Sequence, residues 1–293
     1  MENNTIINIS NNLDNYCWNT SICSSQADKT CGKCHIAKYC SVKCQREHWS
    51  QHKLSCSKLK NNINTNKKTD FDLVGFMDTF PIISSMMGKN QIYGILYYLK
   101  QVIDNGIEGD IVELGCNVGT TSIFIRKFLD VYGCDKKYHV YDGWQGLPPK
   151  VKEDESATSY QFPQGCCKTT KDYFISVFNH FNLELPIIHS GWFKEIPDNE
   201  YPEKICLAFY DGDFYTSITD SFNKTFDKVQ KGGIIIIDDI GGDSLDNHPL
   251  PGSERAVIDF LKSRRETYDY SGYANKDFVF DNLPHGGAKI NKL

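Results

Sequence analysis

The chain has 293 residues, of which 40% are hydrophobic and 24% are charged, and its net charge is −5. This apolar content is enough for a full hydrophobic core, which excludes a wholly disordered chain. No apolar run reaches the roughly 18 residues that a membrane-spanning helix needs, and the first residues predict no export signal. We therefore expect a cytoplasmic protein, with the nucleus as the open alternative, and the net charge disfavours a protein that coats nucleic acid.

Two polar segments divide the chain. Residues 1–16 are rich in asparagine and residues 57–70 in lysine and asparagine, so we expect a disordered tail and a flexible linker. Between them, residues 17–56 hold seven of the twelve cysteines. Residues 24–68 carry a net charge of +8, which leaves −13 for the remainder. We predict a small basic domain at 17–56 followed by a large acidic domain at 71–293.

The cysteine-rich segment has the ligand types of a metal site. Cysteines interleaved with histidine at short spacings are typical ligands of structural Zn²⁺, and eight of them make two tetrahedral sites. The predicted zinc ligands are Cys17, Cys23, Cys31, Cys34, Cys40, Cys44, His52 and Cys56. A domain of about 40 residues buries too little apolar surface to fold alone, so we expect metal binding to stabilise it. Buried thiols without a metal are the alternative.

The stretch from Cys31 to Cys56 resembles a MYND zinc finger through Tyr39-Cys40-Ser41, Cys44-Gln45, Trp49 and His52-x3-Cys56. The resemblance implies interleaved sites, one formed by Cys17, Cys23, Cys40 and Cys44 and the other by Cys31, Cys34, His52 and Cys56. The family usually opens with Cys-x2-Cys, which would place the first ligand at Thr20, so a non-ligand role for Cys17 stays open. MYND fingers imply a protein partner, often a proline-containing peptide; contact with nucleic acid is the weaker alternative.

From Phe71 onward the hydrophobic pattern alternates between helical and strand periodicity. Helices are predicted at 71–88, 91–105, 120–129, 170–181, 217–229 and 253–262. Strands are predicted at 110–115, 138–142, 186–189, 205–210 and 234–237, with a closing hairpin from 267–273 and 277–280. This order indicates an α/β fold with a mostly parallel sheet covered by helices on both faces. Ligands of such sheets bind at the carboxyl ends of the strands.

A glycine-containing turn follows the first predicted strand of this sheet. The sequence Glu113-x-Gly115-x3-Gly119 opens a helix, so backbone amides at the turn can approach a ligand closely. A dinucleotide-binding enzyme would show G-x-G-x-x-G, and Glu113 would repel a pyrophosphate. The acid suits instead the sulfonium and ammonium groups of S-adenosylmethionine (SAM). Asp142, at the end of the next strand, is predicted to bind the ribose hydroxyls.

Three further residues are predicted to contact SAM. Asn117 and Thr121 lie on the same turn, and Trp144 follows Asp142 closely in sequence. A purely structural position is the alternative for each of them, and for Trp144 that alternative is the hydrophobic core.

Four more motifs occur in a fixed order, at residues 140–148, 191–197, 210–217 and 232–239. Together with the Glu113 motif they resemble the macrocin O-methyltransferase (TylF-like) family of SAM-dependent enzymes over residues 90–262. The resemblance implies a Rossmann-like class I methyltransferase fold, a divalent metal, usually Mg²⁺, beside the methyl donor, and an acceptor hydroxyl on a sugar.

Acidic residues follow two neighbouring predicted strands. Asp211 ends one, and Asp238 and Asp239 end the other, so their carboxylates converge and would repel one another unless a hard cation were bound. The family resemblance places the magnesium ligands at these three positions, and Asp211 is also assigned to catalysis. Asp213 is the predicted general base. Catechol-type relatives carry a lysine three residues after the first metal aspartate; Phe214 stands there, which disfavours a catechol acceptor.

The sequence thus predicts a Mg²⁺-dependent, SAM-dependent O-methyltransferase acting on a hydroxyl of a sugar or glycan, with a finger that binds a protein. The alternative is a non-catalytic interaction protein on a methyltransferase fold. No SET-like pattern is present, which disfavours protein lysine methylation. The presence of Glu113 and of all three aspartates favours the enzyme, because a chain that had lost its substrate would tend to lose one of them.

Overall fold

A computed structural model describes residues 29–30, 38–47, 49, 53, 71–241, 244–263, 273–274, 278–283 and 287–293. The chain forms two compact units, one of residues 1–81 with 178–183 and one of residues 82–177 with 184–293. The predicted tail at 1–16 and the predicted linker at 57–70 lie outside the described residues. Among the described residues, no helix combines the length and the apolar character needed to cross a bilayer.

The first unit contains short elements. Strands β1 (Lys29–Thr30) and β2 (Lys38–Tyr39) pair antiparallel, and residues 42–47 are helical. Helix α2 (Leu73–Met77) begins at the N-cap Asp72, whose carboxylate accepts the backbone N–H of Gly75. A helix running to residue 88 was expected here, and that expectation is wrong. Pro81 has no N–H and disfavours a helical conformation at the preceding residue, so the helix ends before it.

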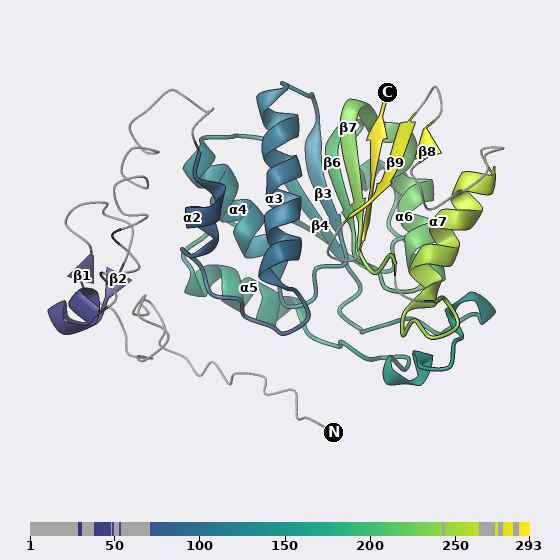
Figure 1. Cartoon of the computed structure of the whole chain (residues 1–293), viewed down its shortest axis with the longest axis horizontal. Coiled ribbons are helices and arrows are strands. Elements are labelled where there is room, and N and C mark those ends of the chain that lie inside the picture. Colours follow the sequence, from purple (N-terminus) through teal and green to yellow (C-terminus); the bar gives the residue numbers. More distant parts are fainter. Residues whose placement is uncertain are drawn as a thin grey trace. The chain divides into compact units, whose positions relative to one another are not determined.

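The second unit is built on an eight-stranded sheet with the strand order β5-β4-β3-β6-β7-β10-β9-β8 (Figure 1). The five parallel strands are β3 (Asp110–Leu114), β4 (Tyr138–Asp142), β5 (Ile187–Ser190), β6 (Ile205–Tyr210) and β7 (Val229–Ile237). The antiparallel strands are β10 (Ala288–Lys292), β9 (Phe278–Asn282) and β8 (Tyr273–Ala274). The parallel strands confirm the α/β prediction.

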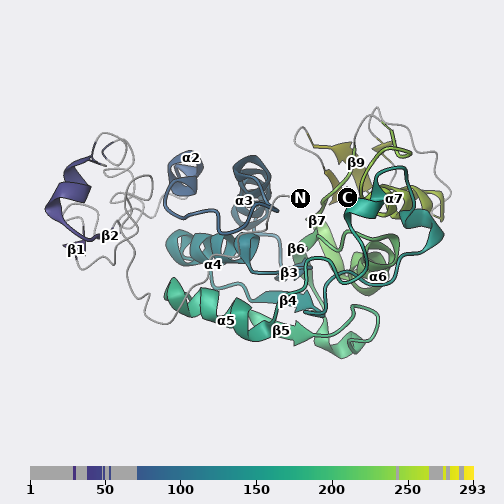
Figure 2. The same cartoon turned by 90° about the horizontal axis from the view of Figure 1, so that it is seen from below.

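Five main helices accompany the strands: α3 (Lys89–Asp104), α4 (Thr120–Tyr132), α5 (Lys171–His180), α6 (Tyr215–Thr225) and α7 (Pro251–Ser263). Figure 2 shows α3 and α4 on one face of the sheet and α6 and α7 on the other. The chain passes from β3 outward to β5 and then returns to β6 on the opposite side of β3. This reversal makes a topological switch point between β3 and β6, where sheets of this type bind ligands.

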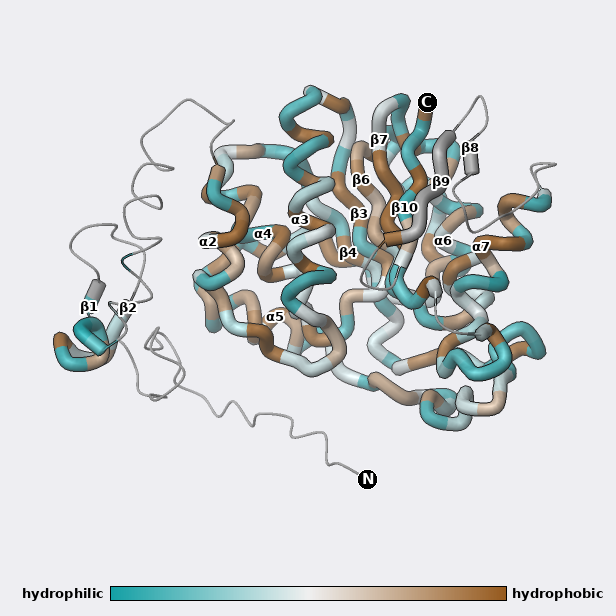
Figure 3. The backbone as a smooth tube through the Cα atoms, viewed as in Figure 1, coloured by the Kyte–Doolittle hydropathy of each residue, from teal (hydrophilic) through white to brown (hydrophobic). Residues whose placement is uncertain are grey.

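The core follows from the continuous apolar strands. All six residues of β6 are buried, and the hydrophobic colouring of β6 and β7 is visible in Figure 3. On the face of α6 and α7, the rings of Phe222 and Phe260 stack with their centroids 4.0 Å apart. The closing hairpin is present as β8 and β9, while residues 267–272 lie outside the described part of the chain. Strand β10 was not predicted.

Candidate active site

The turn between β3 and α4 has the geometry of a close-approach turn. Gly115 has φ +92°, and a Cβ there would lie 1.9 Å from the carbonyl oxygen of Asp211 on the neighbouring strand's exit. Gly119 has φ +87° and is the N-cap of α4, and Asn117 has φ +44°. Two left-handed glycines let the backbone turn sharply and lie against the end of β6, as the sequence motif indicated.

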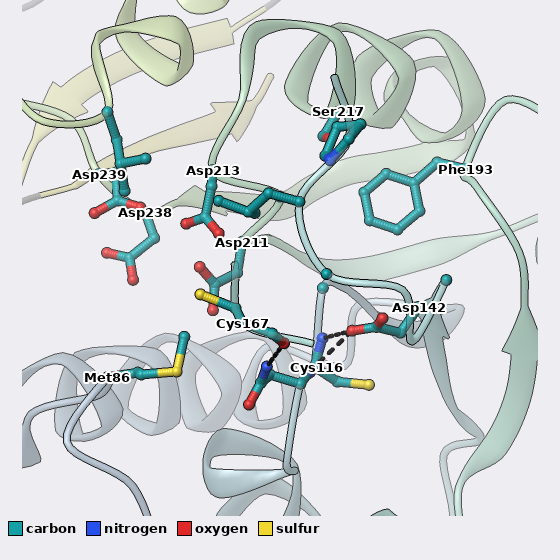
Figure 4. A pocket seen from close by; sticks show the side chains of 18 of the residues that line it. Met86, Cys116, Asp142, Cys167, Phe193, Asp211, Asp213, Ser217, Asp238 and Asp239 are labelled. Carbon is teal, nitrogen blue, oxygen red and sulfur yellow. Dashed lines mark hydrogen bonds between the residues drawn. The ribbon is translucent and has the colours of Figure 1, made fainter. Parts of the chain in front are cut away.

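Asp142, at the end of β4, holds this turn in place (Figure 4). Its Oδ2 accepts the backbone N–H groups of Cys116 (3.0 Å) and Asn117 (2.9 Å), and its Oδ1 accepts the N–H of Trp144 (2.7 Å). The carboxylate lines the cavity described below. Since a carboxylate offers about four acceptor positions, three amide bonds leave room for a ligand hydroxyl.

Glu113 lies in β3, two residues before Gly115, and is almost fully buried. Its Oε2 accepts hydrogen bonds from the hydroxyls of Ser122 (2.7 Å) and Tyr138. Burial raises the pKa of Glu113 to about 7, against the opposing effect of these two hydrogen bonds. A buried carboxyl of this kind favours a cation beside it, because a cation stabilises its charged form.

Four aspartates gather at the carboxyl ends of β6 and β7 (Figure 4). Carboxylate oxygens of Asp211, Asp213 and Asp239 all lie within 4.8 Å of one another. The fourth, Asp238, accepts the side-chain amide of Gln91 through both oxygens, at 3.2 and 3.4 Å. The predicted magnesium ligands Asp211 and Asp239 are therefore close together, with Asp213, the predicted base, beside them and Asp238 turned toward α3.

The pKa values of this cluster reflect burial and mutual repulsion. Burial, followed by the charges of Asp238 and Asp213, raises the pKa of Asp211 well above its usual range. Burial raises the pKa of Asp213 to about 6, with a hydrogen bond to Asp239 acting in the opposite direction. Burial and the adjacent Asp239 raise the pKa of Asp238 to about 7. Carboxyls crowded in this way are stabilised in their charged form by a divalent cation.

The turn, Asp142 and the acid cluster line one cavity of about 660 Å³. This volume lies within the range of cofactor pockets. The acids on its wall are Glu113, Asp142, Glu195, Asp211, Asp213, Asp220, Asp238 and Asp239. Among the described residues that line the cavity, Lys194 is the one basic side chain. Such a wall attracts cationic ligands and repels phosphates.

The remaining predicted cofactor residues divide into two groups. Asn117 and Thr121 line the cavity, and Asn117 donates its side-chain amide to the carbonyl oxygen of Cys167 at 2.5 Å. Trp144 is not among the lining residues. Its ring packs against Phe174, and its Nε1 donates to Ser190 at 3.3 Å, so it is placed as a core residue. Its positive φ of +58° shapes the loop after Asp142.

Sequence reasoning missed several residues of the site. Gln91 joins the start of α3 to the acid cluster, since its Oε1 accepts the N–H of Gly88 (2.8 Å) while its amide binds Asp238. The sequence does show Gln91 as a possible capping residue three positions after Gly88. Its second partner, Asp238, lies 147 residues away and could not be inferred from the local pattern. Cys167 lines the cavity on an irregular loop that carries no pattern. Phe214, which the sequence placed at the position of the catechol-type lysine, does not line the cavity. It is buried against Leu147 and Leu250.

Of the eight predicted zinc ligands, Cys40 and Cys44 lie in the described part of the chain. Their sulfur atoms are 3.4 Å apart, and the Oγ of Ser41 accepts the N–H of Cys44 (3.1 Å). Two Zn–S bonds of about 2.3 Å at a tetrahedral angle place sulfurs roughly 3.8 Å apart, so the pair is somewhat closer than that geometry requires and near enough to bind one ion. Cys17, Cys23, Cys31, Cys34, His52 and Cys56 lie outside the described residues.

Sequence comparison gives two relatives from Streptomyces species. The chain is 26% identical over 170 residues, 56% of its length, to the 8-demethyl-8-(2,3-dimethoxy-alpha-L-rhamnosyl)-tetracenomycin-C 4'-O-methyltransferase of Streptomyces olivaceus. It is 28% identical over 162 residues, 53% of its length, to the demethyldecarbamoylnovobiocin O-methyltransferase of Streptomyces niveus. The matches span 65% and 62% of these relatives, less than two thirds of their length.

A short match points to a different protein class. Thirty residues, 10% of the chain, are 57% identical to the histone-lysine N-methyltransferase SMYD3 of Mus musculus and cover 7% of that protein. This match is too short to define a domain.

The fold has a close counterpart among solved structures. The structure of the O-methyltransferase NovP superposes with a TM-score of 0.58 at 22% identity, covering 71% of this chain and 81% of that one. The sheet of this chain therefore has the same Rossmann-like fold as that structure. The model of the macrocin O-methyltransferase (TylF) family matches residues 30–265, and the chain belongs to that family.

Proposed function

We propose that this chain transfers the methyl group of SAM to a hydroxyl of a sugar or glycan, with Mg²⁺ held at the acid cluster. The observation that carries the proposal is the convergence of Asp211, Asp213 and Asp239 in the same cavity as the Gly115–Gly119 turn. A turn that admits a cofactor and a cluster that calls for a hard cation are the two parts that such a reaction needs.

The cavity suits SAM for two reasons. Gly115 has no space for a side chain because its backbone lies against the end of β6, and the turn that it forms lines the cavity. The excess of acids over Lys194 on the wall favours a ligand with positive groups and disfavours a pyrophosphate. We assign Glu113, Gly115, Asn117, Gly119, Thr121 and Asp142 to this site, with Asp142 toward the ribose.

The acid cluster suits Mg²⁺, which prefers carboxylate oxygens. Asp211 and Asp239 are our first two ligands. Asp238, which would have to leave Gln91, is the third ligand expected from the sequence. Asp213, beside these ligands, would act as the general base. Its pKa in the metal-free chain is about 6, so near neutral pH Asp213 is mostly ionised and able to accept the proton of the acceptor hydroxyl.

When bound, SAM supplies an electrophilic methyl group and Mg²⁺ a Lewis acid that lowers the pKa of a coordinated hydroxyl. The chain would hold both groups at the ends of its strands, because the turn and the acid cluster line one cavity. The sugar acceptor rests on analogy, since the name of the S. olivaceus relative specifies a rhamnosyl-bearing tetracenomycin.

For the N-terminal segment we propose a MYND-type finger at residues 17–56 that binds two zinc ions and a protein partner. The distance between the Cys40 and Cys44 sulfurs supports one of these zinc sites, and the short SMYD3 match is in keeping with the finger. A closed zinc site has no open coordination position, so the finger takes no part in methyl transfer.

The test is a panel of glycosides and glycans incubated with methyl-labelled SAM, with and without Mg²⁺. We expect Mg²⁺-dependent labelling, which Asp211→Asn lowers about a hundredfold or more while SAM affinity stays within about threefold of wild type. Asp220→Asn makes the same charge change on the wall of the same cavity, outside the cluster, and should retain most activity. Wild-type turnover by Asp211→Asn, or tighter binding of NAD than of SAM, would overturn the proposal.

A further inference from the structure

A second cavity opens beside the acid cluster. It has a volume of about 170 Å³ and lies between α3 and the ends of β6 and β7. Met87 and Asp238 line both this cavity and the larger one. The two cavities are therefore neighbours that share part of their walls at the acid cluster.

The wall of the second cavity is mostly apolar. Phe209, Ile236 and Ile237 form the side toward the sheet, and tyrosine rings of α3 form the opposite side. The rings of Tyr93 and Tyr97 are stacked, with centroids 6.3 Å apart. The polar residues on its wall include Asn90, Gln91 and Asp238, and the last two are joined by hydrogen bonds. A wall of this kind binds a ring or an alkyl group.

Gly94, in the interior of α3, keeps this cavity open. Glycine inside a helix costs roughly 1 kcal/mol relative to alanine. Neither common reason for a glycine applies here, because its φ is not in the left-handed region and a Cβ would meet no heavy atom within 4 Å. The lining includes Gly94, so the effect of the missing side chain is space in the cavity wall.

We propose that this cavity is an acceptor subsite that binds an apolar group about the size of one benzene ring, carried next to the hydroxyl that is methylated. The inference rests on the proposed function and narrows its substrate class to acceptors with an aryl or compact alkyl group close to that hydroxyl. The volume fits one ring, since an apolar protein cavity of about 150 Å³ is known to take up benzene.

Benzyl alcohol is the probe, because it joins one hydroxyl to one ring. Its binding to the full-length protein with SAM and Mg²⁺ present is measured by ligand-observed NMR. Gly94→Leu fills the cavity and should weaken binding roughly tenfold to a hundredfold, as expected for loss of ring burial. Gln101→Leu places the same side chain two turns along α3, outside the cavity, and should bind the probe like wild type. Gly94→Ala should keep most binding and raise the melting temperature.

The outcomes separate this inference from the proposed function. Calorimetric SAM binding is measured for each variant, and we expect it to be unchanged, since Gly94 does not line the larger cavity. If wild type binds SAM but binds benzyl alcohol no more tightly than Gly94→Leu does, the proposed subsite is wrong and the proposed function is unaffected. Equal losses in Gly94→Leu and Gln101→Leu would do the same. Failure of wild type to bind SAM would remove the proposed function itself.

Discussion

Glu113 shows how the cofactor turn affects stability before any ligand binds. Its pKa rises from 4.5 to about 7 on folding, so between these pH values the folded chain holds a proton that the unfolded chain has lost. The free energy of unfolding therefore falls as pH rises through this window and stays lower above it. Glu113→Gln removes the titration and keeps acceptors for Ser122 and Tyr138.

The pKa of Glu113 differs by about 2.5 units between the unfolded and the folded chain. We therefore expect the unfolding free energy of wild type to fall, relative to that of Glu113→Gln, by about 3 kcal/mol between pH 4.5 and pH 7.5. Urea unfolding of both proteins without SAM or Mg²⁺ measures the difference at each pH. Glu195→Gln makes the same charge change at an exposed position on the cavity wall and is the control. A constant difference between wild type and Glu113→Gln across the window would contradict the buried, protonated carboxyl.

Asp142 has a structural task in addition to the role proposed for it at the ribose. Asp142→Ala leaves the N–H groups of Cys116 and Asn117 without their acceptor. We expect it to lower stability by about 1–3 kcal/mol and SAM affinity about ten- to a hundredfold. Urea unfolding and calorimetric titration measure the two losses separately. A variant that unfolds and binds SAM like wild type would remove both assignments.

The sequence predicted which residues lie at the site better than it predicted the contacts that these residues make. Position at a strand end predicted that Asp142, Asp211, Asp238 and Asp239 lie at one edge of the sheet. It did not predict that Asp238 turns toward Gln91, because that bond joins residues 147 positions apart. Nor did it place Trp144, since an aromatic residue after a cofactor acid fits a ligand contact and a core position equally well.

At the scale of elements, the parallel strands were the most predictable parts. The strands at 138–142 and 205–210 have the predicted bounds, because unbroken apolar runs between turns have few other uses. The helix expected at 71–88 ends instead at Met77, because the effect of Pro81 on the backbone outweighs the helical spacing of the apolar residues. Strand β10 was missed because it is short and polar on one side, and its partner β7 precedes it by some fifty residues.

The junction of β3, its turn and β6 should be the least tolerant of added volume. Gly115→Ala places a Cβ against the backbone of Asp211 at a left-handed φ, so neither a side-chain movement nor a rotation relieves the clash. We expect a loss of about 3 kcal/mol or more in unfolding free energy. Gly94→Ala, the same substitution in the open interior of α3, should instead gain up to about 1 kcal/mol. Thermal and urea unfolding compare the two, and equal effects would contradict the close approach.

For the whole molecule, charge and metal chemistry divide the chain in the same way as its sequence pattern. Residues 24–68 carry +8 and the remainder −13, and acids outnumber basic residues on the wall of the larger cavity. The proposed magnesium site uses carboxylate oxygens and the proposed zinc sites use thiolates and an imidazole, so we expect each metal to bind its own part of the chain. This separation predicts that zinc and magnesium are lost independently.

We expect elemental analysis to give two zinc ions per chain, one after Cys44→Ala, and none for a chain that begins at residue 71. A zinc-selective chelator, followed by added Mg²⁺, should leave SAM affinity and turnover on a small acceptor within about twofold of the untreated enzyme, because closed zinc sites offer no position to a substrate. The chain beginning at residue 71 should behave in the same way, and Asp211→Asn serves as the control that loses turnover and retains both zinc ions. With a macromolecular acceptor or partner the finger raises local concentration, so its removal should lower the rate there alone. If the shortened chain binds SAM like wild type but no longer methylates a small acceptor, the finger must contribute to the active site, and the two-domain division proposed here is wrong.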